Sequence, residues 1–341
     1  MMKHPFLAPI LAPVLAIASV CAALAAPAMA DQVVQRTVDQ VILPAMDGFA
    51  NATAALAKAA ESDCRADAPA LKPSFNAAFD AWLAAAPFEL GPMDPQAQGL
   101  PVAFWPDPKG MVPRTLTGLL QDQALAGMDY SGQSIAARGF FALETMLYDP
   151  AFMSYGSNDP GCALVQAATG DLAATAAALD QRWQIELAVQ LGSAGPDNSR
   201  YHSDEEARAA VLTTLVAALE FIADQRLARP LGTLDTPRPT RAEAIASGRT
   251  QRNIVLSLAA ARALTDHLTA GGTGDLLANF DYAQSTAAAL QDPVLADVAT
   301  PGGRLRVQNV MDAVERVIGS VHAELGPELG VTAGFNALDG D

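Results

Sequence analysis

The chain has 341 residues and a formal net charge of -16, from 21 Lys and Arg against 37 Asp and Glu. Hydrophobic residues make up 51% of it, which is too apolar for a disordered protein, and three cysteines are too few for a disulfide scaffold. The acidic balance argues against a nucleic-acid partner, because a phosphate-binding surface needs clustered Lys and Arg. The length suggests about two domains.

The first thirty residues have the pattern of a secretory signal peptide. Lys3 and His4 form a positive start, an apolar run follows, and Ala28-Met29-Ala30 matches a cleavage site. A transmembrane anchor is the alternative, but prolines within the run and the small residues at its end favour cleavage. We therefore expect residues 1–30 to be removed near Ala30, leaving an exported chain of residues 31–341 without a transmembrane anchor.

Export places the remaining cysteines in an oxidising compartment. Cys64 and Cys162 are an even pair, and each lies in a polar, turn-like context. We predict a disulfide between them, which would close a loop of roughly 100 residues; two unrelated thiols are the alternative. A zinc site is a poor explanation, because the pair has neither a C-x-x-C spacing nor a nearby His.

Alanine-rich segments with apolar residues three and four apart predict an all-α fold of antiparallel helices packed into bundles. The first is 33–60, which we expect to be kinked at Pro44. The same pattern recurs at 75–83, 164–191, 207–227, 253–268 and 305–325. Alternating β-branched runs, the sign of a sheet, are not evident.

A shaped loop is predicted around Trp105. Phe104 and Trp105 precede two prolines, at Pro106 and Pro108, and this spacing cannot continue a helix. Trp105 then either forms the wall of a pocket or closes the end of a bundle.

Glu144 is the most unusual charged residue. We expect a helix that begins near Ser131 and continues to Tyr148, in which Glu144 shares a face with Phe140 and Phe141. Burying an unpaired carboxylate on an apolar face is costly. Glu144 is therefore expected to be protonated, to pair with an Arg such as Arg138 in a structural salt bridge, or to belong to a polar site.

The domain boundary is predicted in the Gly- and Ser-rich cluster 192–199, which separates two long helical patterns. An N-terminal bundle would then comprise residues 31–195, and a C-terminal bundle residues 196–341. Ser203, followed by three acidic residues, has the pattern of a helix start in the second bundle.

Four segments together resemble the imelysin-like family. They are Arg138-Gly139-Phe140-Phe141-Ala142-Leu143-Glu144, the loop Phe104–Gly110, the stretch Ser247-Gly248-Arg249-Thr250 with Asn253-Ile254, and the ending Gly334–Asp341. The resemblance covers essentially the whole mature chain. It implies two helical bundles, export to the bacterial periplasm, and a functional site near the domain interface. Members are named as metallopeptidases, and many are linked to iron uptake or iron regulation.

The family pattern Gly-x-His-x-x-Glu is only partly present here. Gly139 and Glu144 match it, but Phe141 stands at the His position. His and Glu three residues apart lie on one helix face and can share a metal ion. Glu144 alone offers a single protein ligand, so it is a weak candidate for binding iron or another divalent metal.

Our leading hypothesis is a non-catalytic periplasmic binding protein of iron or other metal uptake, with a metal ion or a small anionic chelate as ligand. The predicted ligand-binding residues are Glu144, Arg138, Trp105, Arg249 and Asn253. One alternative is a peptidase dependent on zinc or another metal, which needs at least three converging ligands and a water. The other is a structural or interaction protein without a ligand.

Overall fold

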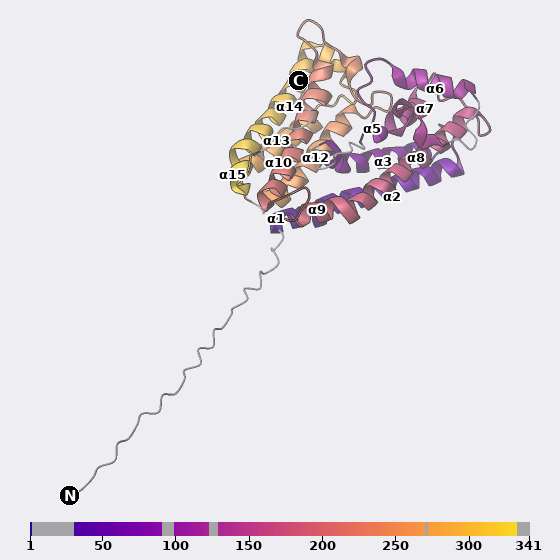
Figure 1. The fold of residues 1–341 in the computed structure, drawn as a ribbon. Coiled ribbons are helices and arrows are strands. Elements are labelled where there is room, and N and C mark those ends of the chain that lie inside the picture. Colours follow the sequence, from indigo (N-terminus) through magenta and orange to yellow (C-terminus); the bar gives the residue numbers. More distant parts are fainter. Residues whose placement is uncertain (2–30, 91–98, 123–128, 270–271, 333–341) are drawn as a thin grey trace.

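A computed structural model describes Met1 and residues 31–90, 99–122, 129–269 and 272–332, and within them every regular element is a helix (Figure 1). The all-α prediction is confirmed. The predicted signal peptide, apart from Met1, and the family-like ending 334–341 lie outside the described residues.

Three long helices form the framework of the first half: α2 (Leu43–Ser62) packs along both α3 (Leu71–Ala85) and α8 (Pro160–Arg182). The shorter α7 (Gly139–Tyr148) lies against α8, and Phe140 on α7 stacks on Phe79 of α3 with ring centroids 4.4 Å apart. The remaining elements are α1 (Gln32–Thr37), α4 (Pro87–Leu90), α5 (Gly99–Val102), α6 (Met111–Asp122), the single turns Tyr130–Gly132 and Ile135–Ala137, and α9 (Ala188–Gly192).

Just before Pro44, where a kink is predicted, the structure has a π-turn. Residues Val38–Ile42 separate α1 from α2, and Pro44 stands in the first turn of α2. Proline has no N–H to donate to the preceding turn, and a locally widened helix accommodates the missing hydrogen bond.

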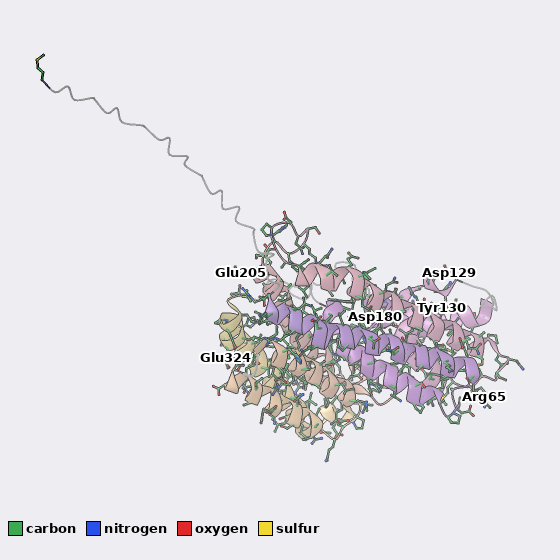
Figure 2. All side chains as sticks on the ribbon, turned by 90° about the horizontal axis from the view of Figure 1, so that it is seen from below. Arg65, Asp129, Tyr130, Asp180, Glu205 and Glu324 are labelled. Atoms are coloured by element: carbon green, nitrogen blue, oxygen red, sulfur yellow. A yellow bond between two sulfur atoms is a disulfide. The ribbon has the colours of Figure 1, made fainter. Side chains whose placement is uncertain are left out.

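The predicted disulfide is confirmed: Cys64 and Cys162 are bonded, with their Cα atoms 5.2 Å apart. It joins the segment just after α2 to the first turn of α8. Figure 2 shows Arg65, the neighbour of Cys64, at the opposite end of the molecule from Glu205 and Glu324.

Helices of the second half lie together at the other end of the molecule from α6 and α7 (Figure 1). Helix α10 (Asp204–Glu220) is central, and α12 (Thr250–Thr269), α13 (Gly274–Ala288) and α14 (Pro301–Ser320) pack in sequence. The other elements of this half are the π-turns Phe221–Ala228 and Val321–Leu325, the short helices α11 (Arg229–Leu231) and α15 (Gly326–Leu329), and the single turns Pro239–Arg241 and Ala296–Ala299. The π-turn Trp183–Leu187 joins α8 to α9 in the first half.

The loop predicted as the domain boundary lies between α9 and α10, and Ser203 caps α10 as expected, because its hydroxyl accepts the N–H of Glu206 at 3.2 Å. Across this boundary α12 packs against α3 and α1. The buried apolar side chains of both halves belong to one continuous cluster. The division into two bundles stays a prediction.

The segment Pro160–Gly192 is long and apolar enough, by length and composition, to cross a membrane. In this fold it packs along α2 and α7, and Cys162 ties its start to the chain after α2. Core helices of soluble proteins have the same composition, so the packing favours a role as a bundle helix.

Candidate functional site

The helix that carries Glu144 begins later than the sequence predicts. Two single turns occupy 130–137, Arg138 is extended with φ -108° and ψ 162°, and α7 starts at Gly139 with φ +70°. A Cβ at Gly139 would lie 2.1 Å from the carbonyl oxygen of Val102. The close approach of α5 therefore requires glycine here, and the left-handed residue breaks the helix that continuous periodicity suggested.

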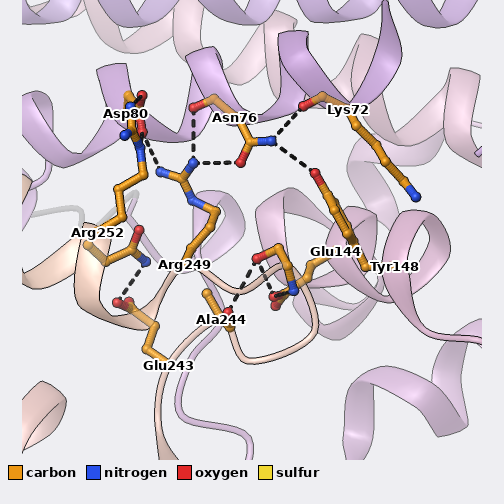
Figure 3. A network of polar contacts seen from close by, with 11 residues as sticks. Lys72, Asn76, Asp80, Glu144, Tyr148, Glu243, Ala244, Arg249 and Arg252 are labelled. Carbon is orange, nitrogen blue, oxygen red and sulfur yellow. Dashed lines mark hydrogen bonds and ion pairs between the residues drawn. The ribbon is translucent and has the colours of Figure 1, made fainter. Parts of the chain in front are cut away.

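Glu144, labelled in Figure 3, is buried, with 6% of its surface exposed. It is held by Ser247 from the second half of the chain. The Ser247 backbone N–H donates to Glu144 Oε1 at 2.8 Å, and the Ser247 hydroxyl donates to the same oxygen at 2.6 Å. None of the described residues donates a hydrogen bond to Oε2. The carboxylate thus has one satisfied oxygen and one free acceptor.

Burial raises the pKa of the Glu144 carboxyl above its ordinary value, and the nearby charge of Glu243 adds to the rise. The hydrogen bonds from Ser247 and the charge of Arg249 oppose it but do not cancel it. The structural salt bridge with an Arg does not occur among the described residues, because the partner of Glu144 is a serine.

We expect Glu144→Gln to change how stability depends on pH. Because the folded state has the higher pKa, the proton on Glu144 stabilises the fold fully below the unfolded pKa, and this stability is lost as pH rises through the folded pKa. Glutamine stays neutral and its carbonyl can still accept from Ser247, so the variant should lose less stability toward neutral pH than the wild type.

Urea unfolding from about pH 4 to about pH 8 measures this difference. The exposed Glu186→Gln is the control and should follow the wild type. A Glu144→Gln variant that is clearly less stable than the wild type at neutral pH would instead indicate a needed negative charge.

Ser247→Ala tests the hydrogen bonds between Ser247 and Glu144. It removes the hydroxyl donor and keeps the backbone N–H, so we expect a loss of about 1–2 kcal/mol in the free energy of unfolding. The same urea titration at neutral pH measures it, and an unchanged free energy would show that the hydroxyl contributes nothing to holding α7.

Arg249, two residues after Ser247, is 2% exposed and reaches α3. Its guanidinium donates to Asn76 Oδ1 at 2.6 Å and to Asp80, which also accepts from Arg252 Nε at 2.9 Å (Figure 3). Burial raises the pKa of Asp80, but the hydrogen bonds from Arg252 and Arg249 outweigh it, so this pKa lies below its ordinary value. These bonds fix the segment that carries Ser247.

The Asn76 side chain continues the network toward α7. Its amide donates to the Tyr148 hydroxyl at 3.0 Å, and the Lys72 ammonium lies 4.8 Å from the centre of the Tyr148 ring. Helices α3 and α7 and the start of α12 therefore meet in one polar interface.

Asn253 lies beside a second buried carboxylate. Its amide donates to Glu243 Oε2 at 2.9 Å, and Arg226 forms an ion pair with the same oxygen at 2.7 Å. Glu243 is 3% exposed and Asn253 is fully buried. This Glu243 charge is the one that acts on Glu144.

Phe141, at the motif's His position, is 7% exposed and surrounded by aromatic rings. The Phe79 ring meets its edge with centroids 5.9 Å apart, and Trp105 stacks on it at 6.4 Å. The residues 104–107 form the non-helical loop that was predicted. Trp105 thus connects this loop to α7 through Phe141.

Arg138 is bound by α8 and not by Glu144. Its guanidinium forms two hydrogen bonds to Asp171, of 2.8 and 2.9 Å, and one to Thr175, both on α8. Of the five predicted ligand-binding residues, the structure gathers Glu144, Arg249 and Asn253 around the segment 243–253 and places Trp105 behind Phe141. Whether any of them binds a ligand stays a prediction.

The residues around Glu144 do not fit a transition metal. Among the described residues, no three His, Cys, Asp or Glu side chains come together as a metal site. Phe141 puts an aromatic ring where the family pattern has an imidazole, and Ser247 already occupies Oε1. A catalytic zinc site needs three protein ligands and an open position, which this part of the chain does not supply.

Sequence reasoning did not select Ser247, Asp80 or Glu243 as site residues, although Ser247 lies in a segment that carries the family resemblance. Ser247 and Glu144 are 103 residues apart, and no periodicity relates them. Asp80 could have been selected from the sequence, because it is a charged residue within an apolar helical pattern, as Glu144 is.

The fold and this interface define an all-helical protein with a buried carboxylate between two parts of the chain. The family model described as Imelysin matches residues 42–321, and the chain belongs to the imelysin family. No curated protein matches.

Two solved structures share the fold. An imelysin-like protein from Psychrobacter arcticum is 22% identical, with a TM-score of 0.73, and the match covers 89% of this chain and 96% of that one. A protein from Parabacteroides distasonis named as an iron-regulated protein A precursor is 15% identical, with a TM-score of 0.63, and the match covers 86% of this chain and 94% of that one.

Proposed function

We propose that this chain is an exported, non-catalytic binding protein of iron or other metal uptake, located in the periplasm. The observation that carries the proposal is the ring of Phe141 packed on Trp105 at the position where the family pattern has a metal ligand. The signal-peptide pattern of residues 1–30 supports export. The likeness to an iron-regulated protein precursor supports the link to iron.

The ligand would bind to polar atoms that have no hydrogen-bond partner in the fold. Glu144 Oε2 accepts no hydrogen bond from the described residues. Arg249 Nε and Asn253 Oδ1 are buried and have no hydrogen-bond partner among them. Buried polar atoms without partners cost about 1–3 kcal/mol each, and such sites are often completed by a bound group or water. A cationic or hydrogen-bonding part of the ligand would meet Glu144.

Elemental analysis of the purified protein and calorimetric titration with iron salts and iron chelates test the proposal. We expect saturable binding of an iron chelate, and Glu144→Gln should weaken it at least about tenfold, as loss of a charged contact predicts. The exposed Glu186→Gln is the matched control and should bind as the wild type does. Absence of binding at millimolar concentrations of every ligand would remove the proposal.

A further inference from the structure

A cavity of about 310 Å³ lies beside Trp105. It lies between the Trp105 loop and the segment 229–242, and its size is at the lower end for small-molecule sites. Its lining includes Trp105, Asp107, Arg229 and Arg241. Of these residues, Trp105 also packs on Phe141 beside the Glu144 interface, and the others are not part of that interface.

Two arginines, Arg229 and Arg241, make this cavity positively charged. Burial lowers the pKa of Arg229, and the positive charge of Arg241 lowers it further. No carboxylate among the described residues forms an ion pair with either guanidinium, and Arg229 Nε is buried without a hydrogen-bond partner. The fold thus holds two positive charges near each other, and a bound anion would reduce the repulsion between them.

The one acidic residue of the lining is engaged elsewhere. The two Asp107 carboxylate oxygens accept the N–H groups of Met111 and Val112, each at 2.8 Å, at the start of α6. The Arg229 guanidinium instead lies 5.6 Å from the centre of the Trp105 ring. The lining therefore carries one more positive than negative charge, with an aromatic face beside it.

We propose that this cavity binds a small polycarboxylate anion, with Arg229 and Arg241 pairing with its carboxylates and Trp105 covering its carbon skeleton. Planar guanidinium groups form paired hydrogen bonds with planar carboxylates, and two of them suit a ligand with two or more carboxylates. The inference goes beyond the proposed function, because it requires no metal on the anion and no contact with Glu144.

Tryptophan fluorescence gives a local readout. The chain has three tryptophans, of which Trp82 and Trp183 are 5% and 0% exposed, so a soluble quencher reaches Trp105 in preference. Titration of the full mature chain with metal-free citrate should protect Trp105 from acrylamide in a saturable way. Calorimetry under the same conditions gives the dissociation constant.

Arg229→Gln and Arg241→Gln should each weaken citrate binding at least about tenfold. Arg241 is exposed, so its variant keeps the test valid if Arg229→Gln fails to fold. Arg316→Gln, on α14 beside Tyr282, is the matched control and should bind normally. Unchanged binding in both test variants, no protection of Trp105, or binding of inorganic phosphate in preference to citrate would overturn the inference.

Discussion

Replacing Gly139 by alanine is expected to reduce the free energy of unfolding by about 3–5 kcal/mol. The residue has φ +70°, a conformation that costs other residues free energy, and its Cβ would overlap the carbonyl oxygens of Val102 and Pro101. Both carbonyls belong to the backbone of α5, so relief requires α5 or α7 to move. That movement would displace Phe141 and Glu144, and urea unfolding measures its cost.

The control for this variant is Gly170→Ala. Gly170 lies within α8, and nothing lies within 4 Å of an added Cβ. Alanine favours a helix over glycine by up to about 1 kcal/mol, so this variant should be slightly more stable than the wild type. Equal stability of the two variants would contradict the close contact between α5 and α7.

Removing the disulfide, by Cys64→Ser together with Cys162→Ser, is expected to cost about 4–5 kcal/mol of stability. The bond links residues 98 positions apart, so its loss releases a long loop in the unfolded chain. The effect should appear as a lower urea midpoint for the double variant and for the wild type treated with a reductant.

The double variant is its own control for the reductant. It has no bond between these positions to break, so reductant should leave its unfolding curve unchanged. A wild type whose midpoint does not fall on reduction would show that the cysteines are not bonded in the folded protein.

The all-helical fold could be predicted because it follows from local chemistry. Alanine-rich segments with apolar residues three and four apart define helices within a few residues, and Pro44 and Ser203 mark an interruption and a start. The disulfide could be predicted because removal of the predicted signal peptide would leave only two cysteines. The start of α7 could not, because the backbone of α5, distant in sequence, forces Gly139 into its conformation.

The site could be predicted only in part. A carboxylate on an apolar helix face pointed to Glu144, and its burial is confirmed. Its partner Ser247 depends on how the segment 243–253 folds back onto α7, which no local pattern encodes. Arg138 was the nearest arginine in sequence, but Asp171 on α8 binds it instead. Proximity along the chain is a poor guide to ion pairs between helices.

The contacts of Phe141 offer a physical reason for a phenylalanine at the His position of the motif. An imidazole at position 141 would lie beside Glu144 as a second metal ligand. The phenylalanine here packs against Phe79 and Trp105, and Trp105 in turn lines the cavity that Arg229 and Arg241 also line. On this account Phe141 removes one metal ligand from beside Glu144 and supports Trp105 at the cavity that we propose binds an anion.

Peptide cleavage by the purified mature chain, with and without a metal chelator, tests the central claim most directly. A non-catalytic binding protein should show no cleavage beyond a buffer blank, and neither the chelator nor Glu144→Gln should change that result. Cleavage that the chelator suppresses and Glu144→Gln abolishes would contradict the account, because it would require Glu144 to work in an assembled metal centre.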